Sequence, residues 1–167
     1  MKKLLAIVLL LAAGLTASAQ GTWSTGMNEA DELKGTTGGP YYLYDVEGMG
    51  SFVLWDFNDW AFKIISENGV FDVWHNNQGN YYIYVTLGLY TLDGKLTEKW
   101  EGTIKADHVA LKTAWINKNA IYYPSTRKKL KKMFRALKSG EGYVRIISKR
   151  RNVEDFDMKV IPYSQQL

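Results

Sequence analysis

Few side chains in this chain could support catalysis or bind a metal. His75 and His108 are the only histidines, and there is no cysteine. A zinc site draws its ligands from His, Cys and carboxylates, and neither histidine lies at a recognised ligand spacing from other such groups. The G-x-S-x-G turn that presents the nucleophile of many serine hydrolases is absent. We therefore expect no metal site, no cofactor and no catalytic nucleophile, and the protein is more readily interpreted as a non-enzyme.

Asp56 and Asp59 form the best carboxylate pair for acid–base chemistry. They lie between Trp55 and Trp60, in a short segment that links two predicted strands. Two carboxyl groups about 5–10 Å apart can hydrolyse a glycosidic bond. Asp also caps the backbone of tight turns, and we favour that role here. A carbohydrate-active hydrolase is accordingly an alternative function.

Tyrosines recur on one side of a predicted strand that begins near residue 81. They alternate there with apolar residues, which places their rings on the solvent side of the sheet. Exposed aromatic rings beside polar groups suit a sugar or a protein partner. The competing interpretation is that the helix or a second sheet covers them. The candidate ligand-binding tyrosines are Tyr82, Tyr84 and Tyr90, and Tyr41, Tyr42 and Tyr44 could extend the same surface.

Positive charge is concentrated late in the chain. Residues 125–151 contain 11 Lys and Arg and a single acidic residue, Glu141, although the whole chain carries only +4. A segment this basic attracts anionic partners. It could equally form the solvated face of a helix that docks on a sheet. Its candidate contact residues are Lys128, Lys131, Lys132, Arg135, Arg150 and Arg151.

Two Asx-Gly dipeptides predict tight hairpins. Asp93-Gly94 should pair Leu92 with Lys95, Leu87 with Trp100, and Ile83 with Ile104. By the same rule Asn68-Gly69 should pair Glu67 with Val70, Ile64 with Val73, and Phe62 with His75. The second hairpin would gather an apolar face from Trp60, Phe62, Ile64, Phe71 and Val73. Alternation of this kind predicts sheets that are apolar on one side.

The remaining elements complete a β-rich fold. The segments at 52–55 and 60–62 should pair, and an early strand lies near Trp23. A helix is expected from about 125 to 138, capped by Ser125 and ended by Gly140, with an apolar stripe formed by Leu130, Met133, Phe134 and Leu137. Two strands, at 143–149 and 153–161, follow it. We predict a mainly β domain: an antiparallel β-sandwich or curled barrel built on a meander, with one amphipathic helix before the last two strands.

The first nineteen residues are typical of a secretory signal peptide. Lys2 and Lys3 precede an apolar run from Leu4 to Leu15, and Ala17-Ser18-Ala19 supplies small residues for cleavage before Gln20. The run is too short to span a hydrocarbon core of roughly 30 Å. We expect a single domain at 20–167 that acts in the periplasm or outside the cell. Without cysteine it cannot be a lipoprotein.

The order of features resembles that of small exported bacterial β-sandwich modules. These features are Trp23-Ser24, Trp100 in a strand, the helix with Phe134, Ala136 and Leu137, then Gly140, Arg145 and Phe156-Asp157. The pattern is similar to invasion-associated locus B proteins and to VasI-like accessory proteins of type VI secretion. The resemblance implies a β-sandwich in the cell envelope and no catalytic residues.

These observations favour an exported, non-enzymatic binding or accessory domain that contacts a protein or glycan of the envelope. Nucleic acid is not an expected partner, because export removes it and no RNA-binding signature is present. No transmembrane segment is expected after signal cleavage. The alternatives are a small-ligand carrier with a cavity inside a β-barrel, and the carbohydrate-active hydrolase.

Overall fold

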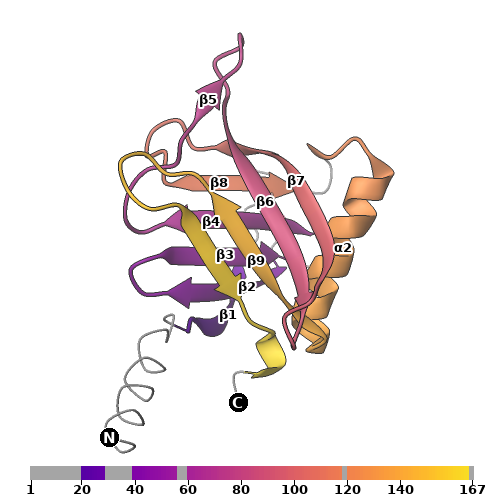
Figure 1. Ribbon diagram of the computed structural model, residues 1–167. Coiled ribbons are helices and arrows are strands. Elements are labelled where there is room, and N and C mark those ends of the chain that lie inside the picture. The colour runs from indigo at the N-terminus through magenta and orange to yellow at the C-terminus, as the bar shows by residue number, and fades with distance from the viewer. Residues whose placement is uncertain (1–19, 29–38, 56–59, 118–119, 166–167) are drawn as a thin grey trace, which may run out of the picture.

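The computed structural model of the protein describes residues 20–28, 39–55, 60–117 and 120–165 (Figure 1). These residues form one antiparallel sheet and one α-helix, so the predicted class is confirmed. The elements, in chain order, are β1 (Thr22–Asn28), β2 (Gly39–Val46), β3 (Gly50–Trp55), β4 (Ala61–Ser66), β5 (Trp74–His75), β6 (Tyr81–Thr91), β7 (Leu96–Ala106), β8 (Thr113–Asn117), α2 (Pro124–Ser139), β9 (Gly142–Ser148), β10 (Phe156–Val160) and the 3₁₀ turn η2 (Tyr163–Gln165).

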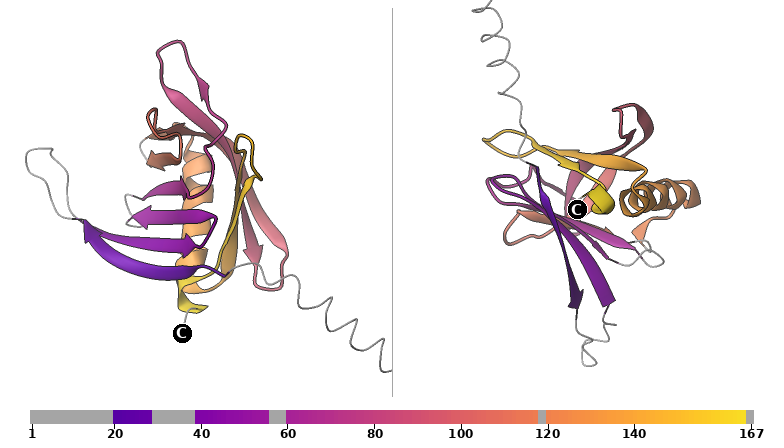
Figure 2. Two further views of the ribbon diagram at one scale, coloured as in Figure 1. Left: turned by 90° about the vertical axis from the view of Figure 1, so that its left-hand side faces the viewer. Right: turned by 90° about the horizontal axis from the view of Figure 1, so that it is seen from below.

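The sheet curls into a half-barrel. Its strand order is β1-β2-β3-β4-β8-β7-β6-β9-β10, with β5 paired to the start of β6. Strands β1 to β4 and β8 cross the direction of β6, β7, β9 and β10, and α2 lies beside both halves (Figures 1 and 2). The end strands β1 and β10 do not pair with each other in the described sheet. Instead, the Trp23 indole N–H donates to the Ile161 carbonyl at 2.8 Å, which ties the two ends together.

The hairpin at Asp93-Gly94 forms in the predicted register. Leu87 lies opposite Trp100 and Ile83 lies opposite Ile104. The predicted pair Leu92–Lys95 is wrong, because Thr91 N–H donates to Lys95 O and closes a longer turn. A register shift between Leu89 and Tyr90 absorbs the extra residue.

The predicted hairpin at Asn68-Gly69 is wrong. Strand β4 pairs with β3, as expected for the first half of the meander, but its other neighbour is β8. Residues 70–73 leave β4 and run beside the end of β9, where the Asp72 N–H donates to Lys149 O at 2.9 Å. The expected apolar face survives this change, because Trp60, Phe62, Ile64 and Phe71 are all buried. Side-chain alternation therefore predicted which residues are buried, but it did not predict which strands pair with β4.

Helix α2 packs its apolar stripe against the inner face of the sheet. It begins one residue earlier than predicted: Tyr123 is the N-cap, Pro124 occupies the first turn, and no side chain caps the helix, so the role assigned to Ser125 is wrong. Gly140 ends the helix in the left-handed conformation, as predicted. The Phe134 ring lies 5.4 Å from the rings of Trp60 and Phe62, and the helix thereby closes the core.

Candidate functional site

A partly exposed cluster of contacting aromatic rings lies on an arm formed by β5 and the start of β6. This arm projects beyond the rest of the sheet (Figure 1). Trp74 lies directly opposite Tyr82, and their rings stack at 4.9 Å with an interplanar angle of 26°. Tyr84 follows on the same side, with its ring 6.3 Å from that of Trp74. Trp74 is 39% exposed and Tyr84 is 68% exposed. We call these three residues the Trp74 stack.

A tight amide-rich turn shapes the tip of the arm. The Asn76 Oδ1 atom accepts hydrogen bonds from the backbone N–H groups of Gln78 and Asn80, both at 3.0 Å. Gly79 has φ +75°, a conformation that the turn requires and that side chains disfavour. The turn sets Trp74 and Tyr82 opposite each other. The side chains of Asn77 and Gln78, at the tip of the arm, are exposed.

Arg151 fixes the base of the arm. Its guanidinium contacts Asp72 Oδ1 at 3.2 Å and donates to Val73 O at 3.0 Å. Arg150 likewise donates to the carbonyls of Glu154 and Asn68, at 2.7 and 2.6 Å. Both arginines were candidate ligand contacts from the sequence. In the structure their donors face the chain itself, and they hold loops in place.

Tyr90 lies apart from the other two candidate tyrosines. It is eight residues from Tyr82 along β6, which is about 27 Å in an extended strand. Its ring stacks on Tyr143 at 5.1 Å and 3°, and Lys159 Nζ lies 4.3 Å from the Tyr143 centroid. Beside this pair Arg145 and Asp157 form an ion pair, whose hydrogen bond raises the pKa of Arg145 above its ordinary value. The sequence thus grouped residues that belong to two surfaces.

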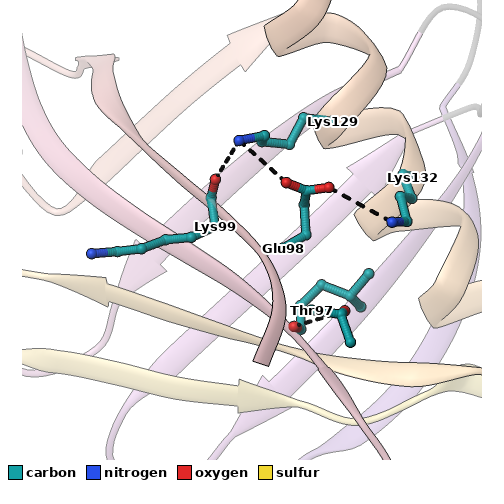
Figure 3. Close-up of polar contacts among 6 residues, drawn as sticks. Thr97, Glu98, Lys99, Lys129 and Lys132 are labelled. Carbon is teal, nitrogen blue, oxygen red and sulfur yellow. Dashed lines mark hydrogen bonds and ion pairs between the residues drawn. The ribbon is translucent and has the colours of Figure 1, made fainter. Parts of the chain in front are cut away.

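The candidate residues of α2 occupy the side of the helix that faces away from the core. Lys132 lies 3.6 Å from the carboxylate of Glu98, which Lys129 also contacts at 3.2 Å while donating to Lys99 O at 2.8 Å (Figure 3). One acidic residue of β7 therefore offsets part of the helix charge. Lys128 and Arg135 are exposed and Lys131 is half-buried. The basic face is thus at least partly the solvated side of a docked helix.

Three further hypotheses from the sequence concern Tyr44, the carboxylate pair and a metal site. Tyr44 does not belong to an outer surface, because it is 1% exposed and its hydroxyl oxygen accepts a hydrogen bond from Gly21 N–H at 3.0 Å. That burial raises the pKa of Tyr44. Asp56 and Asp59 lie outside the described residues. Within the described ranges no group of three His, Asp or Glu side chains could hold a metal ion.

The described interior of the sheet is filled by side chains. Phe52, Phe62, Ile83, Leu87 and Phe134 are all completely buried in it. One pocket of about 10 Å³, lined by Trp23, Tyr42, Leu54, Leu137, Lys138 and Tyr163, lies at its margin. A groove of about 850 Å³, open to solvent, lies between the end of β2 with the turn that follows it and strands β9 and β10. Neither feature is an enclosed cavity of the size that a carried ligand fills.

Trp74 is the residue of the stack that sequence reasoning did not place in a binding site. The Asn-rich turn that follows could have shown more: a turn centred on Gln78 places Trp74 opposite Tyr82. The signal was therefore present, but only once that turn is treated as a hairpin.

Comparisons with protein-family models, curated proteins and solved structures find no match to this chain. The resemblance to exported β-sandwich modules accordingly stays a prediction. Within the described part of the chain, no helix is long and apolar enough to cross a membrane.

Proposed function

We propose that the protein is an exported, non-enzymatic binding domain that holds a glycan of the cell envelope on the Trp74 stack. The observation that carries this proposal is the placement of two large, solvent-exposed aromatic rings, Trp74 and Tyr84, around Tyr82 on a projecting arm. Folding does not explain their exposure, because rings that serve the core are buried. Exposed apolar clusters on soluble domains commonly mark contact sites.

The chemistry of the arm suits a sugar. Aromatic rings offer flat apolar faces that pack against the C–H faces of a pyranose, and neighbouring amides hydrogen-bond to its hydroxyl groups. Asn77 and Gln78 supply such amides at the tip. The amides are uncharged hydrogen-bonding groups, so a sugar hydroxyl loses little hydrogen-bond free energy when it exchanges water for them. Export, which is part of this proposal, rests on the signal-like residues 1–19.

A protein ligand is the second candidate, favoured by one observation. The stack projects on an arm, and a projecting aromatic anchor can enter a pocket of a partner. The two candidates differ in what competes for the surface: free sugars displace a glycan and leave a protein complex intact. The carrier alternative finds no support in the filled interior described above.

The test compares two variants of the purified protein. Replacing Tyr82 and Tyr84 with Ala should abolish retention on immobilised envelope polysaccharides, measured by affinity electrophoresis. Tyr122→Ala is the matched control, because Tyr122 is 88% exposed and lies outside the stack. Circular dichroism should show both variants folded. If wild type and the double variant migrate alike in every polysaccharide, the stack does not bind glycans. Capture of an envelope protein that free sugars fail to displace would favour a protein ligand.

A further inference from the structure

Two members of the Trp74 stack, Trp74 and Tyr82, lie at one end of a longer row on the outer face of the sheet. Backbone register places Trp74 opposite Tyr82, Tyr82 opposite Lys105, Lys105 opposite Trp115, and Trp115 opposite Lys63. These five residues come from β5, β6, β7, β8 and β4. Residues directly opposite each other in antiparallel strands share a face and have Cβ atoms about 4.5–5.5 Å apart. The five side chains therefore form one continuous line across the strands.

The line alternates in chemistry over four strands. From β6 to β4 its members are Tyr82, Lys105, Trp115 and Lys63, so an aromatic ring and an ammonium group take turns. Neighbouring strands lie about 4.8 Å apart. The backbone positions of residues of one kind therefore recur at roughly twice that spacing, about 9.6 Å. This is close to the length of one disaccharide unit in an extended glycan.

The positive charge of the row is not neutralised by the surrounding protein. Lys105 is exposed and makes no ion pair with the described residues, and Lys63 Nζ lies 5.3 Å from the Trp55 ring centroid. Cation–π contact leaves the donors of Lys63 available on the side away from the ring.

Acidic side chains near the row already have partners. Asp72, two residues before Trp74, contacts Arg151 at 3.2 Å. Asp107 accepts hydrogen bonds from the N–H groups of Val109 and Ala110, which lower its pKa. Asp107 therefore stays ionised two residues from Lys105, but it forms no ion pair with Lys105 in the described chain, so both lysines of the row can attract an anion from outside.

We propose that this row binds an extended acidic polysaccharide with a carboxylate on alternate sugars. Tyr82 and Trp115 would each pack on a sugar ring, and Lys105 and Lys63 would each meet a carboxylate. The inference rests on the proposed function, because it names the class of glycan held by the same surface. An acidic protein would not need the regular alternation across strands, whereas a repeating polymer makes use of it.

The test measures binding of the purified protein to three oligosaccharide series of equal length by calorimetry. Hyaluronan carries a carboxylate on alternate sugars, polygalacturonate carries one on every sugar, and chitin oligosaccharides carry none. We expect the tightest binding to hyaluronan, with an affinity that falls as salt is added. Replacing both Lys63 and Lys105 with Gln should weaken it by about ten-fold, because exposed charge pairs contribute modestly.

Two further variants distinguish a loss of binding from a loss of folding. Lys105→Gln alone changes an exposed side chain and should weaken hyaluronan binding while leaving the melting temperature unchanged. Lys95→Gln removes an exposed charge from the β6–β7 turn, outside the row, and should leave binding unchanged.

Two results would overturn the inference. If chitin oligosaccharides bind as tightly as hyaluronan, and the lysine variants bind like wild type, the row does not select acidic sugars, although the proposed glycan-binding function stands. If no oligosaccharide binds and none is retained by envelope polysaccharides, the proposed function fails with it.

Discussion

The packing of α2 makes a quantitative prediction for Phe134→Ala. Phe134 is fully buried, with the rings of Trp60 and Phe62 each at 5.4 Å and that of Phe52 at 6.1 Å. Phe→Ala in a packed core costs about 3–5 kcal/mol. Its three aromatic neighbours come from sheet strands or the chain beside them and cannot collapse into the space. We therefore expect a loss of about 4 kcal/mol.

Urea denaturation followed by tryptophan fluorescence and far-ultraviolet circular dichroism measures this loss. For a domain of this size the slope of the free energy of unfolding is about 2 kcal/mol/M, so the midpoint should fall by about 2 M. The matched control is Arg135→Ala, on the exposed side of the same helix, which should change stability by less than about 0.5 kcal/mol. A midpoint shift for Phe134→Ala as small as that of the control would refute the docked helix and the filled core.

Two other substitutions probe the backbone and a buried hydroxyl. Gly50→Ala should lower the melting temperature sharply, because Gly50 has φ +128° and an added Cβ would lie 1.9 Å from Ile65 O. Gly39→Ala is the control, because no atom lies within 4 Å of its added Cβ. Calorimetry measures both melting temperatures. Tyr44→Phe should cost about 1–3 kcal/mol at neutral pH, since the buried Gly21 N–H loses its acceptor. Burial raises the pKa of Tyr44, so wild type loses stability as pH rises above about 10, and the variant should lose less over that range.

The sequence predicted one Asx-Gly hairpin correctly and the other wrongly for a physical reason. The strands on either side of Asp93-Gly94 are long and carry matching apolar faces, so local pairing buries most of these apolar residues, although Leu96 stays 46% exposed. After Asn68-Gly69 the chain offers the same alternation, but so does the distant segment that forms β8. Ser66 N–H donates to Lys112 O at 2.7 Å, and Arg151 N–H donates to Val70 O at 2.9 Å. The two halves of the expected hairpin therefore each hydrogen-bond to a distant segment and do not pair with each other. Alternation fixes the buried face and leaves the choice between partners to the tertiary structure.

The candidate site was predictable only to the extent that it depends on one strand. Alternation along β6 gave the outward direction of Tyr82 and Tyr84. Composition could not separate Lys128, which is exposed, from Lys129, which contacts Glu98, because that difference depends on where β7 lies. The row through Lys105 and Trp115 was equally out of reach, since it requires the register of several strand pairs.

The outer positions of β6 and β7 carry similar residue types at both ends. Tyr82 and Tyr84 lie at the end of β6 near the arm, and Tyr90 lies at its other end, stacked on Tyr143. On β7, Lys105 lies in the row and Lys99 lies near the far end. Tyrosine is a good strand former, so strand propensity accounts for its presence at either end. Residue type alone therefore does not mark a binding surface, and the Tyr82, Tyr84 and Lys105 variants must test the row by measured binding.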